Sequence, residues 1–381
     1  MPVLHRPAVL PVVALALAGT SLTAVPAAAA TTVRCGDTLT RDTRLTRDLR
    51  CTGDGLTLAP GVRLDLDGHR LRGDGTGTGV RALGSTGATV RDGRVEGWRR
   101  GIDFEGATPY PDQTLVLDRV HVVDAPVSLV AAVTTVTRSE FVRSEVYLQQ
   151  NTFTADRTTF DRSSTVGELN LVTLRRSTVL GAGVAADENN EVDIVDSTLD
   201  GTGAPREAVG CYGRRTFTRT TVRDYATPLF VYDVCPTLVS GSTFSDNPGG
   251  ALLAAEGAGG PTTLVVTGST FRRNAFGVKG EAVSVTSSRF DRNGEGVHLT
   301  DGDGSVVAGT TITRSTGTGL LVDAGRASVG GVRADRNGAY GIYAPQAVDL
   351  GGNRASGNGT ANCVGVRCTL SGSQSRTSPS R

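Results

Sequence analysis

Apolar residues recur along most of this chain in one short signature: an aliphatic residue, two others, Ser or Thr, one other, then Phe, Val, Leu or Ile. Val239–Ser242–Phe244 and Val266–Ser269–Phe271 show it clearly. Around the signature the apolar positions alternate with a period of two, as in Val283-Ser284-Val285, and helical spacing is almost absent. The residues are β-formers punctuated by Gly and Asn. This pattern predicts short β-strands.

The last residue of the signature, which we call the core position, returns about every 22 residues, at intervals of 19 to 27. The core positions are Leu71, Val95, Val122, Phe141, Phe160, Val179, Leu199, Val222, Phe244, Phe271, Phe290, Ile312, Ala334 and Ala355. Such self-similarity is the mark of a solenoid, in which each coil buries its apolar face only against its neighbours.

Other repetitive β-folds fit this period less well. A sandwich does not repeat one motif in one phase, and a propeller blade needs roughly twice the period. A left-handed β-helix requires strict hexapeptides, which the variable intervals exclude. The sequence therefore predicts an all-β, single right-handed parallel β-helix of about 14 coils, with three short strands per coil.

Two polar positions keep a fixed phase with the core position. Two residues before it stand hydroxyls that we expect to hydrogen-bond to each other along the axis: Ser139, Thr158, Ser177, Ser197, Thr220, Ser242, Ser269, Ser288 and Thr310. Three residues after it stands Asn in five coils: Asn247, Asn274, Asn293, Asn337 and Asn358. Asn tolerates the left-handed conformation of a tight turn, and its amide can ladder with the next coil.

The phrase F-x-x-N-x-x-G-V at Phe290–Val297 resembles the repeat of the pectin-lyase-like superfamily. The opening from Cys35 to Cys51, followed by Leu64–His69, is also similar to the capped start of bacterial β-helix proteins. This resemblance covers roughly residues 33–368 and implies a right-handed parallel β-helix. Polysaccharide lyases, glycosidases and epimerases are common in that superfamily, but the motifs of its better-marked enzymes are missing from this chain.

The two ends of the chain differ from the repeat. Residues 1–30 combine a short polar start, an apolar stretch and Ala28-Ala29-Ala30, the pattern of a cleaved secretory signal. We therefore expect a secreted, extracellular protein with an N-terminal cap over 31–62, the β-helix over 63–360, and a C-terminal cap and disordered tail over 361–381.

Six cysteines suit an oxidising destination. Cys211 and Cys235 stand 12 and 13 residues after successive core positions, so they lie on adjacent coils about 4.8 Å apart, close enough for a disulfide. We expect Cys35–Cys51 to staple the N-terminal cap and Cys363–Cys368 the C-terminal one. No cysteine and histidine spacing favours a metal site.

The charge is nearly balanced, with 39 basic and 38 acidic residues and a net charge of +1. Bulk electrostatics therefore favours neither a nucleic acid nor a membrane surface as partner, and we find no basic stripe. No segment after the signal is apolar enough to span a membrane, and we expect a monomer.

Acidic residues recur ten to twelve positions after the core position and predict an acidic column along one edge: Asp233, Glu256, Glu281, Asp301 and Asp323. Two such carboxylates could serve a glycosidase, or the column could hold Ca²⁺; we expect no other cofactor. They could equally be solvated residues of a surface turn. His298, near Asp301, is the candidate general base.

Tyrosines fall in the same region and offer rings that could stack on sugars: Tyr147, Tyr212, Tyr232, Tyr340 and Tyr343. The candidate substrate-binding residues are Tyr212, Tyr232, Tyr340 and Tyr343, with Asp233, Glu256, His298, Asp301 and Asp323 as candidate catalytic residues. The sequence favours a protein that binds a polysaccharide or cell-surface glycan, or a non-catalytic surface or matrix protein. The alternative is a polysaccharide lyase or glycoside hydrolase that acts on an acidic polysaccharide.

Overall fold

The computed structural model describes residues 32–84, 87–106, 113–184, 190–204, 208–210, 213–231, 235–254 and 264–369. Arg34–Arg381 forms one compact unit. The predicted signal over 1–30 lies outside the described residues. Within the described residues every regular element is a β-strand, and no helix is present that is long and apolar enough to cross a membrane.

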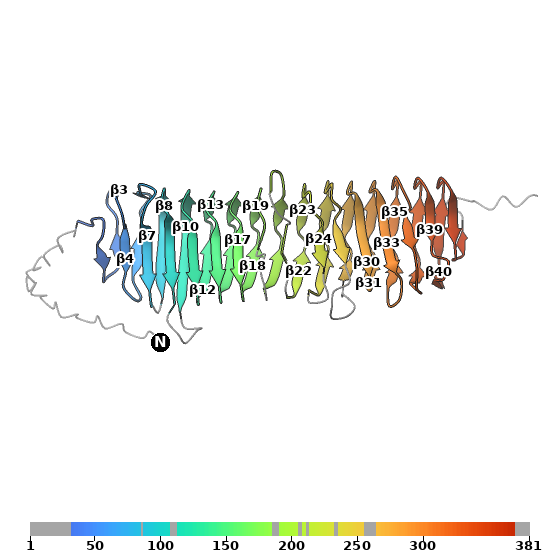
Figure 1. The fold of residues 1–381 in the computed structure, drawn as a ribbon, viewed down its shortest axis with the longest axis horizontal. Coiled ribbons are helices and arrows are strands. Elements are labelled where there is room, and N and C mark those ends of the chain that lie inside the picture. Colours follow the sequence, from blue (N-terminus) through green and yellow to red (C-terminus); the bar gives the residue numbers. More distant parts are fainter. Residues whose placement is uncertain are drawn as a thin grey trace, which may run out of the picture. The chain divides into compact units, whose positions relative to one another are not determined.

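All strands pair in parallel with the equivalent strands of the coils before and after, and the coils stack along one axis (Figure 1). Sheet A covers the first half of the solenoid: β1 (Thr38–Leu39), β4 (Leu56–Leu58), β7 (Thr78–Leu83), β9 (Arg100–Glu105), β11 (Val127–Val130), β14 (Val146–Gln149) and β17 (Thr165–Glu168). Sheet C takes its place in the second half: β24 (Leu229–Val231), β27 (Leu252–Ala254), β30 (Phe276–Glu281), β33 (Glu295–Asp301), β36 (Leu320–Val322), β39 (Tyr340–Tyr343) and β42 (Ala361–Val364).

Sheet B runs the whole length in two rows. Row B1 contains β2 (Thr43–Arg44), β5 (Arg63–Asp65), β12 (Val133–Thr137), β15 (Thr152–Asp156), β18 (Leu171–Arg175), β20 (Glu191–Val195), β22 (Arg215–Thr218), β25 (Thr237–Ser240), β28 (Leu264–Thr267), β31 (Val283–Thr286), β34 (Val306–Ala308), β37 (Ser328–Gly330) and β40 (Val348–Gly351). Two long strands, β8 (Ala88–Glu96) and β10 (Thr114–Val123), belong to both rows.

Row B2 holds the core positions, and its labels β3, β13, β19, β23 and β35 follow one edge of the solenoid in Figure 1. It contains β3 (Leu49–Arg50), β6 (Arg70–Arg72), β13 (Glu140–Val142), β16 (Thr159–Asp161), β19 (Thr178–Leu180), β21 (Thr198–Asp200), β23 (Thr221–Arg223), β26 (Thr243–Ser245), β29 (Thr270–Arg272), β32 (Arg289–Asp291), β35 (Thr311–Thr313), β38 (Arg333–Asp335), β41 (Asn353–Ser356) and β43 (Cys368–Thr369).

Strand register confirms the predicted repeat. Every core position pairs with the next, from Leu71 opposite Val95 to Ala334 opposite Ala355. The phenylalanines stack in parallel inside the solenoid, with ring centroids 4.7 Å apart between Phe271 and Phe290. The predicted fold class, an all-β right-handed parallel β-helix with three strands per coil, is therefore confirmed. The pairing starts one coil earlier than the predicted series, where Leu49 lies opposite Leu71.

The buried hydroxyls do not bond to each other, so that part of the prediction is wrong. Ser242 Oγ donates to the carbonyl of Ser240 and accepts from the backbone N–H of Thr220, on the preceding coil. Ser269 repeats this arrangement with Thr267 and Ser242. The carbonyl of Ser240 also accepts the backbone N–H of Arg219, so the group at this corner that depends on the hydroxyl is the backbone N–H of Thr220.

The predicted asparagine ladder is confirmed. Asn247 Nδ2 donates to Asn274 Oδ1 over 2.8 Å, Asn274 Nδ2 donates to Asn293 Oδ1 over 3.0 Å, and all three residues are buried. Asparagine is not the left-handed residue of the turn, however. That conformation belongs to the residue before it, as at Arg273 (φ 54°) and Arg292 (φ 54°), because the buried Asn must present its amide to the stack.

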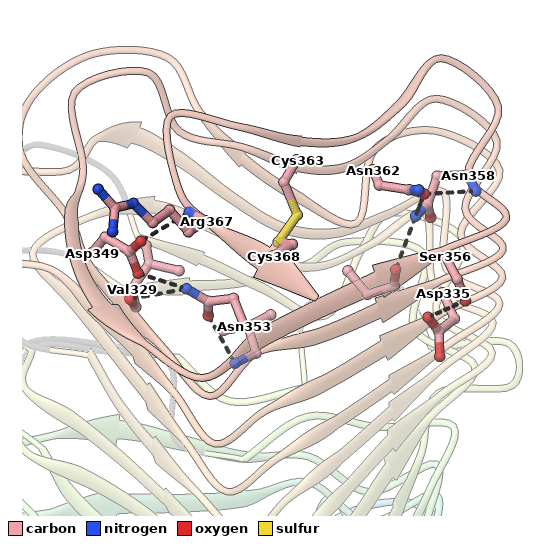
Figure 2. The surroundings of a disulfide bond; sticks show 12 residues. Val329, Asp335, Asp349, Asn353, Ser356, Asn358, Asn362, Cys363, Arg367 and Cys368 are labelled. Atoms are coloured by element: carbon pink, nitrogen blue, oxygen red, sulfur yellow. Dashed lines mark hydrogen bonds between the residues drawn. A yellow bond between two sulfur atoms is a disulfide. The ribbon is translucent and has the colours of Figure 1, made fainter. Parts of the chain in front are cut away.

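Disulfides close both ends of the described solenoid as predicted. Cys35–Cys51 joins the segment before β1 to the residue that follows β3, and Cys363–Cys368 joins β42 to β43. Figure 2 shows this second bridge beside the end of the asparagine ladder, where Asn358 donates to Asn362. Cys235 is disulfide-bonded, but its predicted partner Cys211 lies outside the described residues, so that pairing stays a prediction.

Candidate functional site

Four of the predicted site residues lie outside the described residues: Tyr212, Tyr232, Asp233 and Glu256. The remaining candidates lie on sheet C or at its end. Glu281 and Asp301 are in register, across an irregularity between Gly280 and Glu281. Asp323 does not continue that column, because its backbone N–H bonds to Leu299, which places it beside Thr300. The regular acidic column therefore ends at Asp301.

His298 contacts two carboxylates, neither of which is Asp301. Its Nδ1 lies 2.9 Å from Glu295 Oε2, and its Nε2 lies 2.7 Å from Asp323 Oδ2 on the next coil. The residue is only 8% exposed. Since both ring nitrogens face carboxylates, neither nitrogen is open to take a proton from a ligand in this arrangement. The predicted general base thus serves as a bridge between two coils.

Asp301 belongs to a turn of its own. Its Oδ1 accepts the backbone N–H of Asp303 over 2.9 Å, the hydrogen bond of a local Asx turn. The same oxygen lies so close to Gly325, whose φ is +73°, that a Cβ on that glycine would clash. Among the described residues no group of three or more His, Cys, Asp or Glu side chains could hold a metal ion.

Tyr340 and Tyr343 of β39 lie close together, with ring centroids 4.9 Å apart. Tyr343 is in register with Leu321, which is in register with His298. The structure therefore places Tyr343 two coils beyond His298 on the same sheet. The substrate-binding role of these two tyrosines stays a prediction.

A cleft that the sequence reasoning missed lies on row B2, over β32, β35, β38 and β41. It has a volume of about 500 Å³ and is lined by Arg289, Thr311, Thr313, Arg314, Arg333, Asp335, Arg336, Arg354 and Ser356. We call it the arginine cleft. Five arginines and one carboxylate line it, so its charge is strongly positive although the whole chain is nearly neutral.

Register explains how the arginines gather. Residues one before the core position point outward, and Arg289, Thr311, Arg333 and Arg354 follow one another on successive coils. Arg314 and Arg336 come from the left-handed turn two residues after the core position, at φ 57° each. Two outward positions of one repeat therefore converge on the cleft.

The acids of this region are engaged by neighbouring arginines. Burial alone would raise the pKa of Asp291, but hydrogen bonds from Arg314 and Thr313 outweigh it and hold that pKa below its usual range. Asp335 accepts Arg333 Nε over 2.6 Å and Ser356 Oγ over 2.8 Å. Within the described chain, the side chains of Arg289, Arg336 and Arg354 are in no ion pair with a carboxylate. These three exposed guanidinium groups are available to an anion.

A signal for the cleft was present in the sequence. Arginine stands two residues after the core position in four consecutive coils, at Arg273, Arg292, Arg314 and Arg336. This row is visible when the outward positions of successive coils are aligned with one another.

Comparison with known proteins adds little to the geometry. No protein-family model matches the chain, and no curated protein matches it. Solved structures similar to it include a periplasmic alginate epimerase (10% identity, TM-score 0.30, 85% of this chain and 76% of that one). Another is the catalytic unit of an α-1,3-glucanase from Streptomyces thermodiastaticus (14%, TM-score 0.28, 87% and 65%).

A third is the receptor-binding protein of bacteriophage Det7 (13% identity, TM-score 0.31, 88% of this chain and 74% of that one). Scores at this level carry no argument about activity. The fold and the arginine cleft define the chain as a parallel β-helix protein with a cationic surface site.

Proposed function

We propose that this chain is a secreted, non-catalytic carbohydrate-binding protein that holds an anionic polysaccharide in the arginine cleft. The observation that carries the proposal is the set of five arginines that line the cleft against one carboxylate. Guanidinium groups recognise carboxylate and sulfate groups through paired hydrogen bonds. Thr311, Thr313 and Ser356 add hydroxyls that can bond to sugar hydroxyls.

A polysaccharide fits this cleft better than a nucleic acid does. Single-stranded nucleic acids are bound through aromatic side chains on which the bases stack, and no aromatic residue lines the cleft. The expected export of the chain also favours a glycan over an intracellular partner.

The proposal of binding without catalysis is supported by the hydrogen-bond partners of Asp291 and Asp335, the carboxylates nearest the arginines of the cleft. Hydrolysis of a glycosidic bond requires one carboxyl group that donates a proton and a second that stays ionised. Asp291 and Asp335 are both buried against arginine and hydroxyl partners. Neither carboxyl group is free to act as the acid.

The test uses three polymers with one backbone: dextran, carboxymethyl dextran and dextran sulfate. We expect the two anionic polymers to bind and dextran not to bind, in calorimetric titration at low salt. The triple variant Arg289→Ala, Arg336→Ala, Arg354→Ala should weaken binding at least tenfold, because each lost guanidinium contact contributes up to about 1 kcal/mol. Arg326→Ala, which removes an exposed arginine outside the cleft, is the control.

Three results would overturn the proposal. Equal binding of dextran and carboxymethyl dextran would show that charge recognition is absent. Release of reducing or unsaturated sugar ends from a uronic acid polymer such as polygalacturonate, by the wild type alone, would make the chain an enzyme. Equal binding of single-stranded DNA and of the anionic dextrans would assign the cleft to polyanions in general.

A further inference from the structure

A second cationic cleft lies at the other end of row B2. It has a volume of about 440 Å³ and is lined by Arg70, Arg94, Arg119, His121, Asp92, Gly68 and Gly93. Arg119 is engaged with Asp92, and Arg94 forms an ion pair with Glu96. Arg70 is in no ion pair with a carboxylate of the described chain. We call this the N-terminal cleft.

The two clefts share one column of side chains. Arg70, Arg94 and His121 occupy the position one residue before the core position, as do Arg289, Arg333 and Arg354 in the arginine cleft. Each residue of this column is in register with the next, so both clefts open on the same outward face of sheet B. A ligand that lies along this face can therefore meet both.

The column between the clefts is almost uncharged. After Glu140, which bonds to His121 over 2.9 Å, it consists of threonine in six successive coils: Thr159, Thr178, Thr198, Thr221, Thr243 and Thr270. Four carboxylates flank this column, and each forms an ion pair with an arginine: Asp161 with Arg162, Asp200 and Asp224 with Arg223, and Asp246 with Arg273. Past Glu140, a polyanion on this path meets threonine hydroxyls and carboxylates that arginines already engage.

We propose that a single extended anionic polysaccharide binds along row B2 and engages both clefts at once. This inference rests on the proposed function. It adds a second, remote subsite and states that the polysaccharide runs along the axis of the solenoid. Arg94 and Arg333 are eleven coil steps apart, which is about 50 Å at about 4.8 Å per step. A polymer that spans this distance binds the second cleft at a high effective concentration.

The experiment compares short and long carboxymethylated oligomers of one glucan, a tetramer and a polymer much longer than the span. We expect the polymer to bind about 100-fold more tightly than the tetramer, per mole of polymer chain. The double variant Arg70→Ala, Arg94→Ala should bring polymer affinity down toward that of the tetramer. It should leave tetramer binding at the arginine cleft unchanged. Arg326→Ala again serves as the control for a lost positive charge.

The outcomes separate the two proposals. If the tetramer and the polymer both fail to bind, the proposed function falls. If the tetramer binds, and the higher affinity of the polymer is explained by the larger number of binding segments on each polymer chain, simultaneous binding to both clefts is excluded. The proposed function then still stands. If the double variant weakens tetramer and polymer binding equally, the N-terminal cleft is not a separate subsite. Its thermal unfolding midpoint, compared with that of the wild type, shows whether the variant is folded.

Discussion

Two neighbouring positions of one turn differ in this molecule: one is buried and the other is exposed. The residue three after the core position is buried and builds the asparagine ladder, as at Asn293 and Asn337. The residue just before it, Arg292 or Arg336, is exposed, adopts a left-handed conformation and lies on the cationic face. The inner position is fixed by hydrogen bonds that burial makes obligatory. The outer position is free to carry recognition.

The largest effect is expected at the inner position. Asn293→Ala removes the acceptor for the N–H and side-chain amide of Asn274, and the donor to the carbonyl of Phe271. Because buried partners are left without hydrogen bonds, the free energy of unfolding should fall by about 2–3 kcal/mol. Urea unfolding measures this. Arg292→Ala, the adjacent exposed residue, is the control and should change stability by less than about 0.5 kcal/mol. Equal losses of unfolding free energy in the two variants would mean that the asparagine ladder does not stabilise the fold.

The outer position should govern binding instead. Arg336→Glu places a negative charge in the arginine cleft and should lower affinity for carboxymethyl dextran about tenfold, or about 1.4 kcal/mol. Its unfolding free energy should stay near that of the wild type, since Arg336 is exposed. His298→Gln, on sheet C, is the matched control, with unchanged affinity expected. A loss of binding in the His298 variant, with Arg336→Glu unaffected, would move the site to sheet C.

Acid should weaken the contacts between coils before it affects the core. Burial alone would raise the pKa of Asp291, but hydrogen bonds from Arg314 and Thr313 hold it low. The pKa of Asp118 is lowered in the same way, in spite of burial, by hydrogen bonds from Thr137 and Arg138. A lowered folded pKa gives stability that is present above the unfolded pKa of about 3.9 and is lost as the pH falls through the folded pKa. We expect the urea midpoint to be flat near neutrality and to fall below about pH 4. Asp291→Asn should reduce that slope, and a midpoint that rises on acidification would contradict the role of these pairs.

The smallest effect concerns the strain of the left-handed turn. Arg292→Gly relieves an L-residue at φ 54° and should stabilise the fold by about 0.5 kcal/mol after the entropy of Gly is counted. Arg272→Gly, in the extended strand β29, should destabilise it by a similar amount. Shifts of opposite sign in the thermal unfolding midpoints of these two variants would confirm that Arg292, and not Arg272, is the left-handed residue. Matching signs would refute it.

The part of this structure that the sequence predicted is its interior. Burial restricts a position to few residue types. Phe271, Phe290 and the asparagines can therefore be assigned to their positions in the repeat although the coils differ in length. The acidic column was harder to place, because a one-residue irregularity at Gly280 and Glu281 shifts the register of outward residues. The left-handed conformation of the arginines could not be predicted from residue type, since Arg has no preference for it, and only their recurrence two residues after the core position marks them. Their cleft appears only when four coils are aligned.

Hydrogen–deuterium exchange with and without carboxymethyl dextran tests the binding face most directly. The two candidate faces lie on different strands of the same coils, so peptides from β32, β35, β38 and β41 can be compared with those from β30, β33 and β36. If the polymer binds the arginine cleft, we expect it to slow exchange in the turns and strand ends around Arg289, Arg314 and Arg336, and to leave exchange in the sheet C strands unchanged. Protection confined to β30, β33 and β36, around His298 and Asp323, would contradict it.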